Sequence, residues 1–190
     1  MDMIVKAEDA LQRGETARGE ARLAEAAEAF AEASALFRHA DNPPRLAHAL
    51  SREAQVARDA LRFHAARDYQ EQALDLARRQ ADPVVLRQML RHMGDILLDC
   101  EAYEAAGATY AEMMDLYRKA PDTPPLELAN ALRSLACHTE AVGNRREAAA
   151  LWRDVRRRYA ALGDQFRDAF GLNGNPGVDE ADSRLRALGE

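Results

Sequence analysis

Arg52, Arg91 and Arg133 are the side chains of this sequence best suited to holding a ligand. The arginine guanidinium is a planar fork of donors that matches a carboxylate or a phosphate. Arg91 has Asp95 one helical turn away, and such a pair contributes about 0.3 kcal/mol within a helix. Arg52 and Arg133 have no acidic residue three or four positions away on either side. We therefore predict that these two arginines contact an acidic ligand, the alternative being that each is simply solvated at the surface.

Other polar residues belong to the same predicted ligand-binding set, namely His48, Gln55, His92, Asp95 and Asn130. The chain has five histidines, but no two of them are four residues apart, the spacing of a metal site on one helix. Glycine-rich phosphate loops, nucleophile elbows and paired catalytic carboxylates do not occur in the sequence. The sequence thus predicts no metal, no cofactor and no enzymatic activity.

The elements that must position these residues are indicated by small residues recurring at a near-constant interval of about 40 residues. The first series consists of Gly14, Ala54, Gly94 and Ala136. A second series follows the first at a constant offset, at Ala26, Ala66, Ala106 and Ala148. Such a period is typical of stacked supersecondary units, here pairs of helices. Small residues at both places allow the two helices of a pair to approach closely.

The expected repeats span residues 3–41, 43–81, 83–121 and 124–163, with turns near residues 20, 61, 101 and 143. Their junctions read Asn42-Pro43-Pro44, Asp82-Pro83 and Thr123-Pro124-Pro125, each with a capping side chain before a proline that suits the first turn of a helix. Gly143 suits the left-handed position that ends a helix. The second repeat is expected to be less regular, because Gln70 occupies the place of an aromatic residue in the other three.

Composition and charge disfavour several classes of protein. The 190 residues are 47% hydrophobic but only 6% aromatic, which suits thin interfaces between closely spaced helices. The formal net charge of −6 argues against nucleic-acid binding, which needs a basic face. There is no run of 18 apolar residues to span a membrane and no signal-peptide pattern at the N-terminus. We expect a cytoplasmic protein whose two cysteines, Cys100 and Cys137, are reduced.

The third and fourth repeats resemble the tetratricopeptide repeat. The resemblance lies in Leu90, Met93, Gly94, Leu97, Tyr103, Ala106 and Tyr110, and in Leu132, Leu135, Ala136, Gly143, Ala148 and Trp152. The long period is similar to that of the lengthened repeats of kinesin light chains and many bacterial regulators. The resemblance covers about residues 3–163 and is weakest in the second repeat, where Glu53 replaces a large apolar residue. It implies an all-α, right-handed solenoid of about four antiparallel helix pairs, whose first helices line a concave groove that receives peptides or partner helices.

Residues 164–190 break the repeat and form the expected tail. Residues 165–170 suggest one or two helical turns, 171–177 a cluster of turn residues, and 178–188 a short amphipathic helix. This helix is expected to cap the last repeat, or alternatively to fold into the groove as an internal ligand. Basic residues outnumber acidic ones by six to two over 144–163, whereas the tail has six acids and three bases. The tail is therefore expected to lie against the basic helix, the alternative being a basic patch for an acidic protein or nucleic acid.

These expectations combine into a non-catalytic scaffold that binds a protein or peptide, with the arginines favouring an acidic one. Neither nucleic acid nor a membrane is an expected partner. The alternative is a structural subunit that self-associates, or packs into a larger complex, through the ends of its stack of helices.

Overall fold

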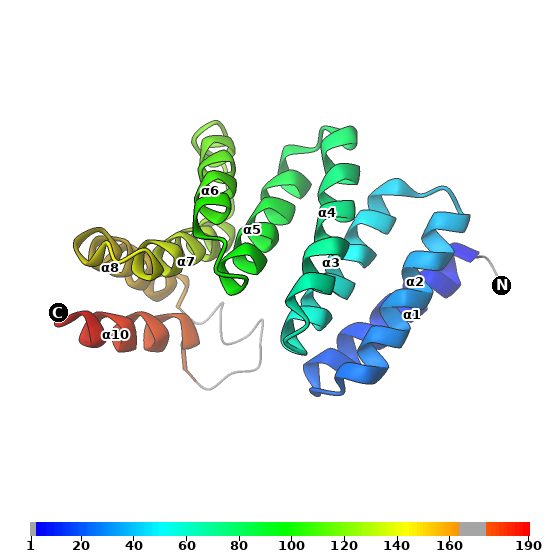
Figure 1. Ribbon diagram of the computed structural model, residues 1–190, viewed down its shortest axis with the longest axis horizontal. Coiled ribbons are helices and arrows are strands. Elements are labelled where there is room, and N and C mark those ends of the chain that lie inside the picture. Colours follow the sequence, from blue (N-terminus) through cyan, green and yellow to red (C-terminus); the bar gives the residue numbers. More distant parts are fainter. Residues whose placement is uncertain (1–2, 164–173) are drawn as a thin grey trace. The chain divides into compact units, whose positions relative to one another are not determined.

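The computed structural model describes residues 3–163 and 174–190. Within these residues the secondary structure is helical, without strands (Figure 1). The helices are α1 (Met3–Gly19), α2 (Leu23–His39), α3 (Pro43–Asp59), α4 (Phe63–Gln80), α5 (Pro83–Asp99), α6 (Tyr103–Arg118), α7 (Pro125–Ala141), α8 (Arg145–Leu162) and α10 (Pro176–Leu188). The all-α fold is confirmed. The helical turns expected at 165–170 and the first part of the expected turn cluster lie outside the described residues.

The starts of α3 and α5 follow the predicted capping pattern. The Asn42 side chain accepts a hydrogen bond from the Arg45 backbone N–H at 3.2 Å. Asp82 accepts from the N–H groups of Val84 and Val85 at 2.8 and 3.4 Å. These bonds satisfy donors that the first turn of a helix otherwise leaves unpaired.

The same prediction is wrong at the start of α7. The residue before this helix is Pro124, whose side chain makes no capping hydrogen bond. Thr123 lies one position further out, and its hydroxyl donates to the Ala120 carbonyl at 2.7 Å. The first proline of the pair thus occupies the capping position and displaces the threonine from it.

One residue in the left-handed region marks the turn within each repeat. These residues are Ala21, Leu61, Glu101 and Gly143, with φ of 59°, 57°, 58° and 81°. The expectation for Gly143 is confirmed. The other three are not glycine, although residues with a Cβ are disfavoured in this region. At these turns the packing of the flanking helices therefore overrides local preference.

The contacts divide the chain into two compact units, Met1–Ala105 and Ala106–Glu190. In the first unit α1 packs on α2, α2 on α3, α3 on α4 and α4 on α5, and α3 also contacts α5. A Cβ at Gly14 would lie 2.5 Å from Cε1 of Phe30, closer than packed carbon atoms come. The expected role of the small residue in α1 is confirmed, since only glycine lets the ring of the second helix lie on its backbone.

Glu53 is buried in the second helix pair, where a large apolar residue was expected. Its exposed fraction is 7%. Burial raises the pKa of its carboxyl group, while Ser34, Arg38 and Tyr69 partly oppose that rise. A raised pKa means that the folded chain disfavours the ionised carboxylate. Glu53 therefore lowers the stability of this helix pair at neutral pH.

The second unit contains most of α6 together with α7, α8 and α10, and its core lies on α8. Trp152 and Tyr159 of α8 are buried and share a cluster with Ala181 and Leu185 of α10. A Cβ at Gly177 would overlap the Tyr159 ring, so the glycine lets α10 begin directly on that ring. Helix α10 packs against α8 and covers its apolar side, as a capping helix does.

Charges on α10 and α8 are matched as the sequence indicated. Arg156 Nε lies 2.5 Å from Asp182 Oδ1, and Arg153 pairs with Glu190. Arg145 donates to the Leu188 carbonyl at 3.2 Å. The prediction that the acidic tail lies against the basic helix is confirmed for the described part of the tail.

Candidate ligand-binding face

Three first helices of the first unit, α1, α3 and α5, carry a continuous set of charged and amide side chains. We call this set the first-helix face, and it consists of Glu15, Arg18, Ser51, Arg52, Gln55, Arg58, Arg91, His92, Asp95 and Asp99. Along each helix, successive members of the set are one, three or four positions apart. This spacing places them on the same side of the helix. Contacts between neighbouring helices join the set into a network.

Between α1 and α3 the network consists of two ion pairs and a shared amide. Arg52 Nε lies 2.6 Å from Glu15 Oε1, and Arg18 Nε lies 2.7 Å from Asp59 Oδ2. The side-chain oxygen of Gln55 accepts from both arginines, at 2.8 Å from Arg18 Nη1 and 3.1 Å from Arg52 Nη1. Gln55 is thereby held between two cations.

Between α3 and α5 the pairing recurs one repeat later. Arg58 forms an ion pair with Asp99. This pair is the equivalent, one repeat period later in the sequence, of the ion pair between Arg18 and Asp59. Arg58 Nη1 also lies 3.9 Å from Asp95 Oδ2. Half-exposed pairs of this kind contribute at most about 1 kcal/mol each. Their main effect is to hold the side chains of the face in fixed positions.

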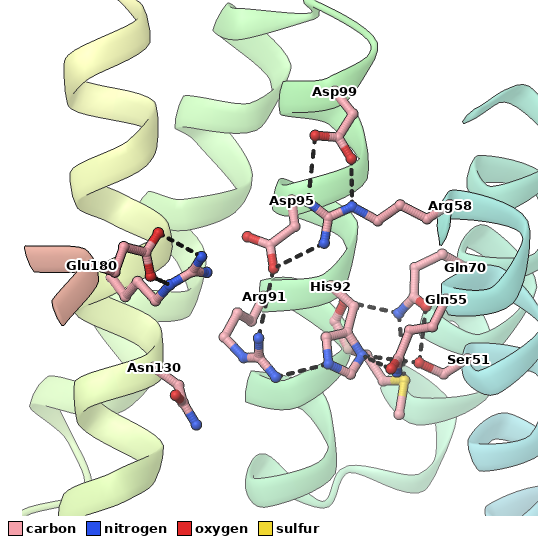
Figure 2. Close-up of polar contacts among 12 residues, drawn as sticks. Ser51, Gln55, Arg58, Gln70, Arg91, His92, Asp95, Asp99, Asn130 and Glu180 are labelled. Atoms are coloured by element: carbon pink, nitrogen blue, oxygen red, sulfur yellow. Dashed lines mark hydrogen bonds and ion pairs between the residues drawn. The ribbon is translucent and has the colours of Figure 1, made fainter. Parts of the chain in front are cut away.

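His92 stands at the centre of the hydrogen-bonded part of this face (Figure 2). Its Nε2 is 2.8 Å from Arg91 Nη2, and its Nδ1 is 3.0 Å from Ser51 Oγ and 3.3 Å from Gln55 Nε2. Because a guanidinium only donates, Nε2 is assigned as the unprotonated nitrogen. In the neutral ring the proton then lies on Nδ1 and points to Ser51, since the Gln55 amide nitrogen is itself a donor.

A chain of hydrogen bonds continues from His92 into the core (Figure 2). Ser51 Oγ donates to Gln70 Oε1 at 3.0 Å, and Gln70 Nε2 donates to the Met89 carbonyl at 2.9 Å. Ser51 is 1% exposed and Gln70 is fully buried. Gln70 therefore replaces the expected aromatic residue with a polar group whose hydrogen bonds are satisfied. The irregular second repeat is the one that links the face to the core.

Burial and nearby arginines lower the pKa values of the two histidines. Burial first, and then the charges of Arg91, Arg52, Arg58 and Arg18, hold the pKa of His92 well below its usual value. Burial, Arg52 and Arg45 lower the pKa of His48 to about 4, with Glu8 opposing. Both rings are therefore neutral near pH 7. The pKa of Arg52 is also lowered, chiefly by burial; the charge of Glu15 opposes this shift, and Arg18 and Arg91 add to it.

Six of the eight predicted ligand-binding residues lie in the first unit, on α3 and α5. Five of them form a connected row, namely Arg52, Gln55, His92, Arg91 and Asp95. The last contact of the row joins Arg91 Nη1 to Asp95 Oδ2 at 3.6 Å. His48 lies one helical turn before Arg52 on α3 and is influenced by its charge.

The other two predicted residues lie on α7 in the second unit. Arg133 forms a two-pronged ion pair with Glu180 of α10, at 2.5 and 2.8 Å. Burial lowers the pKa of Arg133, but the hydrogen bond and charge of Glu180 outweigh it, so the pKa is raised. Asn130 accepts a hydrogen bond from the Tyr159 hydroxyl at 2.6 Å.

Arg52 and Arg133, which have no acidic neighbour within their own helices, both have one on another helix. Their partners Glu15 and Glu180 come from distant places in the sequence. The roles of Arg18, Arg58, Asp59 and Asp99 were not anticipated. Arg18 and Arg58 are one repeat period apart in the sequence, and so are Asp59 and Asp99. This spacing is the signal by which they could have been found.

The network on this face is suited to holding a polar ligand rather than to bond-breaking chemistry. Ser51 and His92 are hydrogen-bonded, but the serine is buried and its hydroxyl donates to Gln70, so it is not presented as a nucleophile. In the described parts of the chain, no group of three or more histidine, cysteine or acidic side chains is arranged to hold a metal ion. No described helix is both long and apolar enough to cross a bilayer.

Comparison with known proteins gives a structural likeness without a sequence match. No family model matches the chain, and no curated protein matches it. A solved Rap protein complexed with Competence and Sporulation Factor superposes on 99% of the chain with a TM-score of 0.79 and 14% identity. Aspartyl phosphate phosphatase F from Bacillus subtilis superposes on 99% with a TM-score of 0.74 and 15% identity. The chain covers 49% of the length of each of these two structures.

A third solved structure is similar over nearly its whole length. It is a putative kinesin light chain from Podosopora anserina with nearly identical TPR-like repeats, matched over 100% of this chain and 97% of that one. The TM-score is 0.70 and the identity is 13%. These likenesses agree with the order of helices and with the long repeat period. The chain therefore has the fold of tetratricopeptide-like helical-repeat proteins.

Proposed function

We propose that this chain is a non-catalytic scaffold that binds a protein or peptide, and that the first-helix face of the first unit is its binding surface. The observation that carries the proposal is the ordered row of Arg52, Gln55, His92 and Arg91 across α3 and α5. Each member is held by a neighbour before any ligand arrives. Such preorganisation reduces the entropy lost on binding.

The expected ligand is acidic. Besides burial, the charges of four arginines lower the pKa of His92, so several guanidinium groups gather at this point of the face, each beside a carboxylate. The side chains of Arg52 and Arg91 keep 27% and 23% of their surface exposed, so both can reach a ligand. A carboxylate of the ligand would add to, or exchange with, the contacts of Glu15 and Asp95. The solved Rap protein in complex with Competence and Sporulation Factor supports a binding role for this fold.

The test is a selection of random peptides on the full chain. Peptides with aspartate or glutamate are expected to be enriched, and their affinity is expected to fall about tenfold or more in the double variant Arg52→Gln, Arg91→Gln. Glutamine is chosen because it removes the charge without placing a second carboxylate beside Glu15 or Asp95. The matched control is Arg67→Gln, which removes an exposed arginine from α4.

Two results would contradict the proposal. One is that no peptide is enriched, and the other is that the control variant loses as much affinity as the double variant. If the chain captures no ligand but changes mass with concentration, the structural-subunit alternative gains.

A further inference from the structure

A mainly apolar hollow lies beside two turns of the first unit. It is separate from the row of Arg52, Gln55, His92 and Arg91 on the first-helix face. It has a volume of about 530 Å³ and opens between the turn that follows α3 and the turn that follows α5. Its lining consists of Leu61, Arg62, Phe63, His64, Ala65, Asp99, Cys100 and Glu101. Of these, only Asp99 also belongs to the face.

Leu61, which lines this hollow, is unusual in its exposure. Its exposed fraction is 75%, higher than that of any other large hydrophobic residue in the described chain. Its φ of 57° lies in the left-handed region, where leucine is disfavoured. The corresponding turns carry Ala21, Glu101 and Gly143 instead. The packing of the chain's own core does not explain a leucine at this place, because most of the side chain is exposed to solvent.

The patch carries both an exposed apolar side chain, Leu61, and an apolar hollow. The side chain of one copy is therefore complementary to the hollow of a second copy. In a two-fold symmetric pair each copy would insert its leucine into the hollow of the other, because both copies would use the same surface.

The charges on the rim of the hollow fit the same arrangement. Arg62 belongs to one turn and Glu101 to the other, and both are exposed. Within the described residues neither has an ion-pair partner. Because Arg62 and Glu101 line the same hollow, a two-fold axis through the patch would bring Arg62 of one copy toward Glu101 of the other, twice in each pair.

We propose that the turn edge formed by Leu61, the hollow beside it, Arg62 and Glu101 is a self-association surface that joins two copies of this chain. The inference goes beyond the proposed function, because the surface lies outside the arginine and histidine row on α3 and α5. It also differs from association through the ends of the helix stack, since its residues come from the turns of the second and third repeats.

The test uses sedimentation of the full chain over a range of micromolar concentrations. The wild-type chain is expected to approach twice its mass of 21.1 kDa. Leu61→Asn is expected to remain at the single-chain mass, because asparagine removes the apolar side chain yet tolerates the left-handed backbone. The matched control is Ala21→Asn, at the corresponding turn of the first repeat with φ of 59°, and it is expected to associate like the wild type.

Charge variants test the two-fold pairing itself. Arg62→Glu and Glu101→Arg are each expected to weaken association, and the double variant is expected to restore it. A wild-type chain that stays at single-chain mass throughout would overturn the proposal, and so would a Leu61→Asn variant that associates normally. Equal loss in the Ala21→Asn control would also overturn it. Because peptide binding is measured separately with the Arg52 and Arg91 variants, failure of either proposal can be told from failure of the other.

Discussion

Replacement of Gln70 by leucine tests whether the buried hydrogen-bond chain stabilises the second helix pair. The leucine is similar in size, but it removes the acceptor of Ser51 Oγ at 3.0 Å and the donor to the Met89 carbonyl at 2.9 Å. Ser51 is 1% exposed, so its hydroxyl would remain in the core without that acceptor. An unsatisfied buried polar group costs about 1–3 kcal/mol. Part of this cost is offset by the burial of an apolar side chain, and we expect a net loss of about 1–2 kcal/mol.

The assay is equilibrium unfolding in urea of Gln70→Leu, Ser51→Ala and the double variant. Because the two side chains are directly bonded, the double variant should lose less than the sum of the single losses, by about 0.5–3 kcal/mol. Gln72→Leu is the matched control, since it makes the same substitution on an exposed position of the same helix and should change stability by no more than about 0.5 kcal/mol. Additive losses, or a Gln70→Leu variant as stable as the wild type, would refute the reasoning.

Three other perturbations follow from the described contacts. Gly14→Ala should lower the free energy of unfolding by about 1 kcal/mol. The cost of overpacking, about 1–3 kcal/mol, exceeds the gain in helix propensity of about 1 kcal/mol. The control Gly19→Ala has open space around the added Cβ and should show no loss. Gly177→Ala should displace α10 from the Tyr159 ring, so hydrogen exchange should speed up in α10 but not in α1–α4; unchanged protection of α10 would contradict this. The pKa of His48, lowered from 6.5 to about 4, contributes stability that is complete above pH 6.5 and is lost as the pH falls toward 4. This loss is on the order of 3 kcal/mol, and unfolding measured across that range should vary less steeply in His48→Gln; parallel curves would contradict the assignment.

The pairing of the helices and the places of the turns within the pairs could be predicted from sequence because their signals are local and repeat. Glycine and alanine at regular intervals, prolines at the junctions and Gly143 at a turn act within a few residues of where they lie. The close packing of Phe30 on Gly14 agrees with the same pattern, since a small residue on the first helix leaves room for the second. At α7 the pattern failed because the helix begins at the second proline, Pro125, so that Pro124 and not Thr123 occupies the capping position.

The partners of the site residues could not be predicted in the same way. Arg52 and Arg133 lack acidic neighbours in sequence, but their ion pairs depend on how one helix is aligned with another. That alignment is set by packing between segments that are far apart in the chain. Gln70 was recognised as an exception to the aromatic series, but its role became clear only when Ser51 and the Met89 carbonyl were placed beside it.

The proposed binding role of the first-helix face can be tested most directly by a hydrogen-exchange footprint. The full chain would be compared with and without an acidic peptide obtained by selection. We expect slower exchange in α3 and α5, around residues 48–55 and 88–95, and no change in α2 and α4. Protection confined to α2 and α4, or to the turn edge around Leu61, would contradict the claim that the first helices carry the ligand.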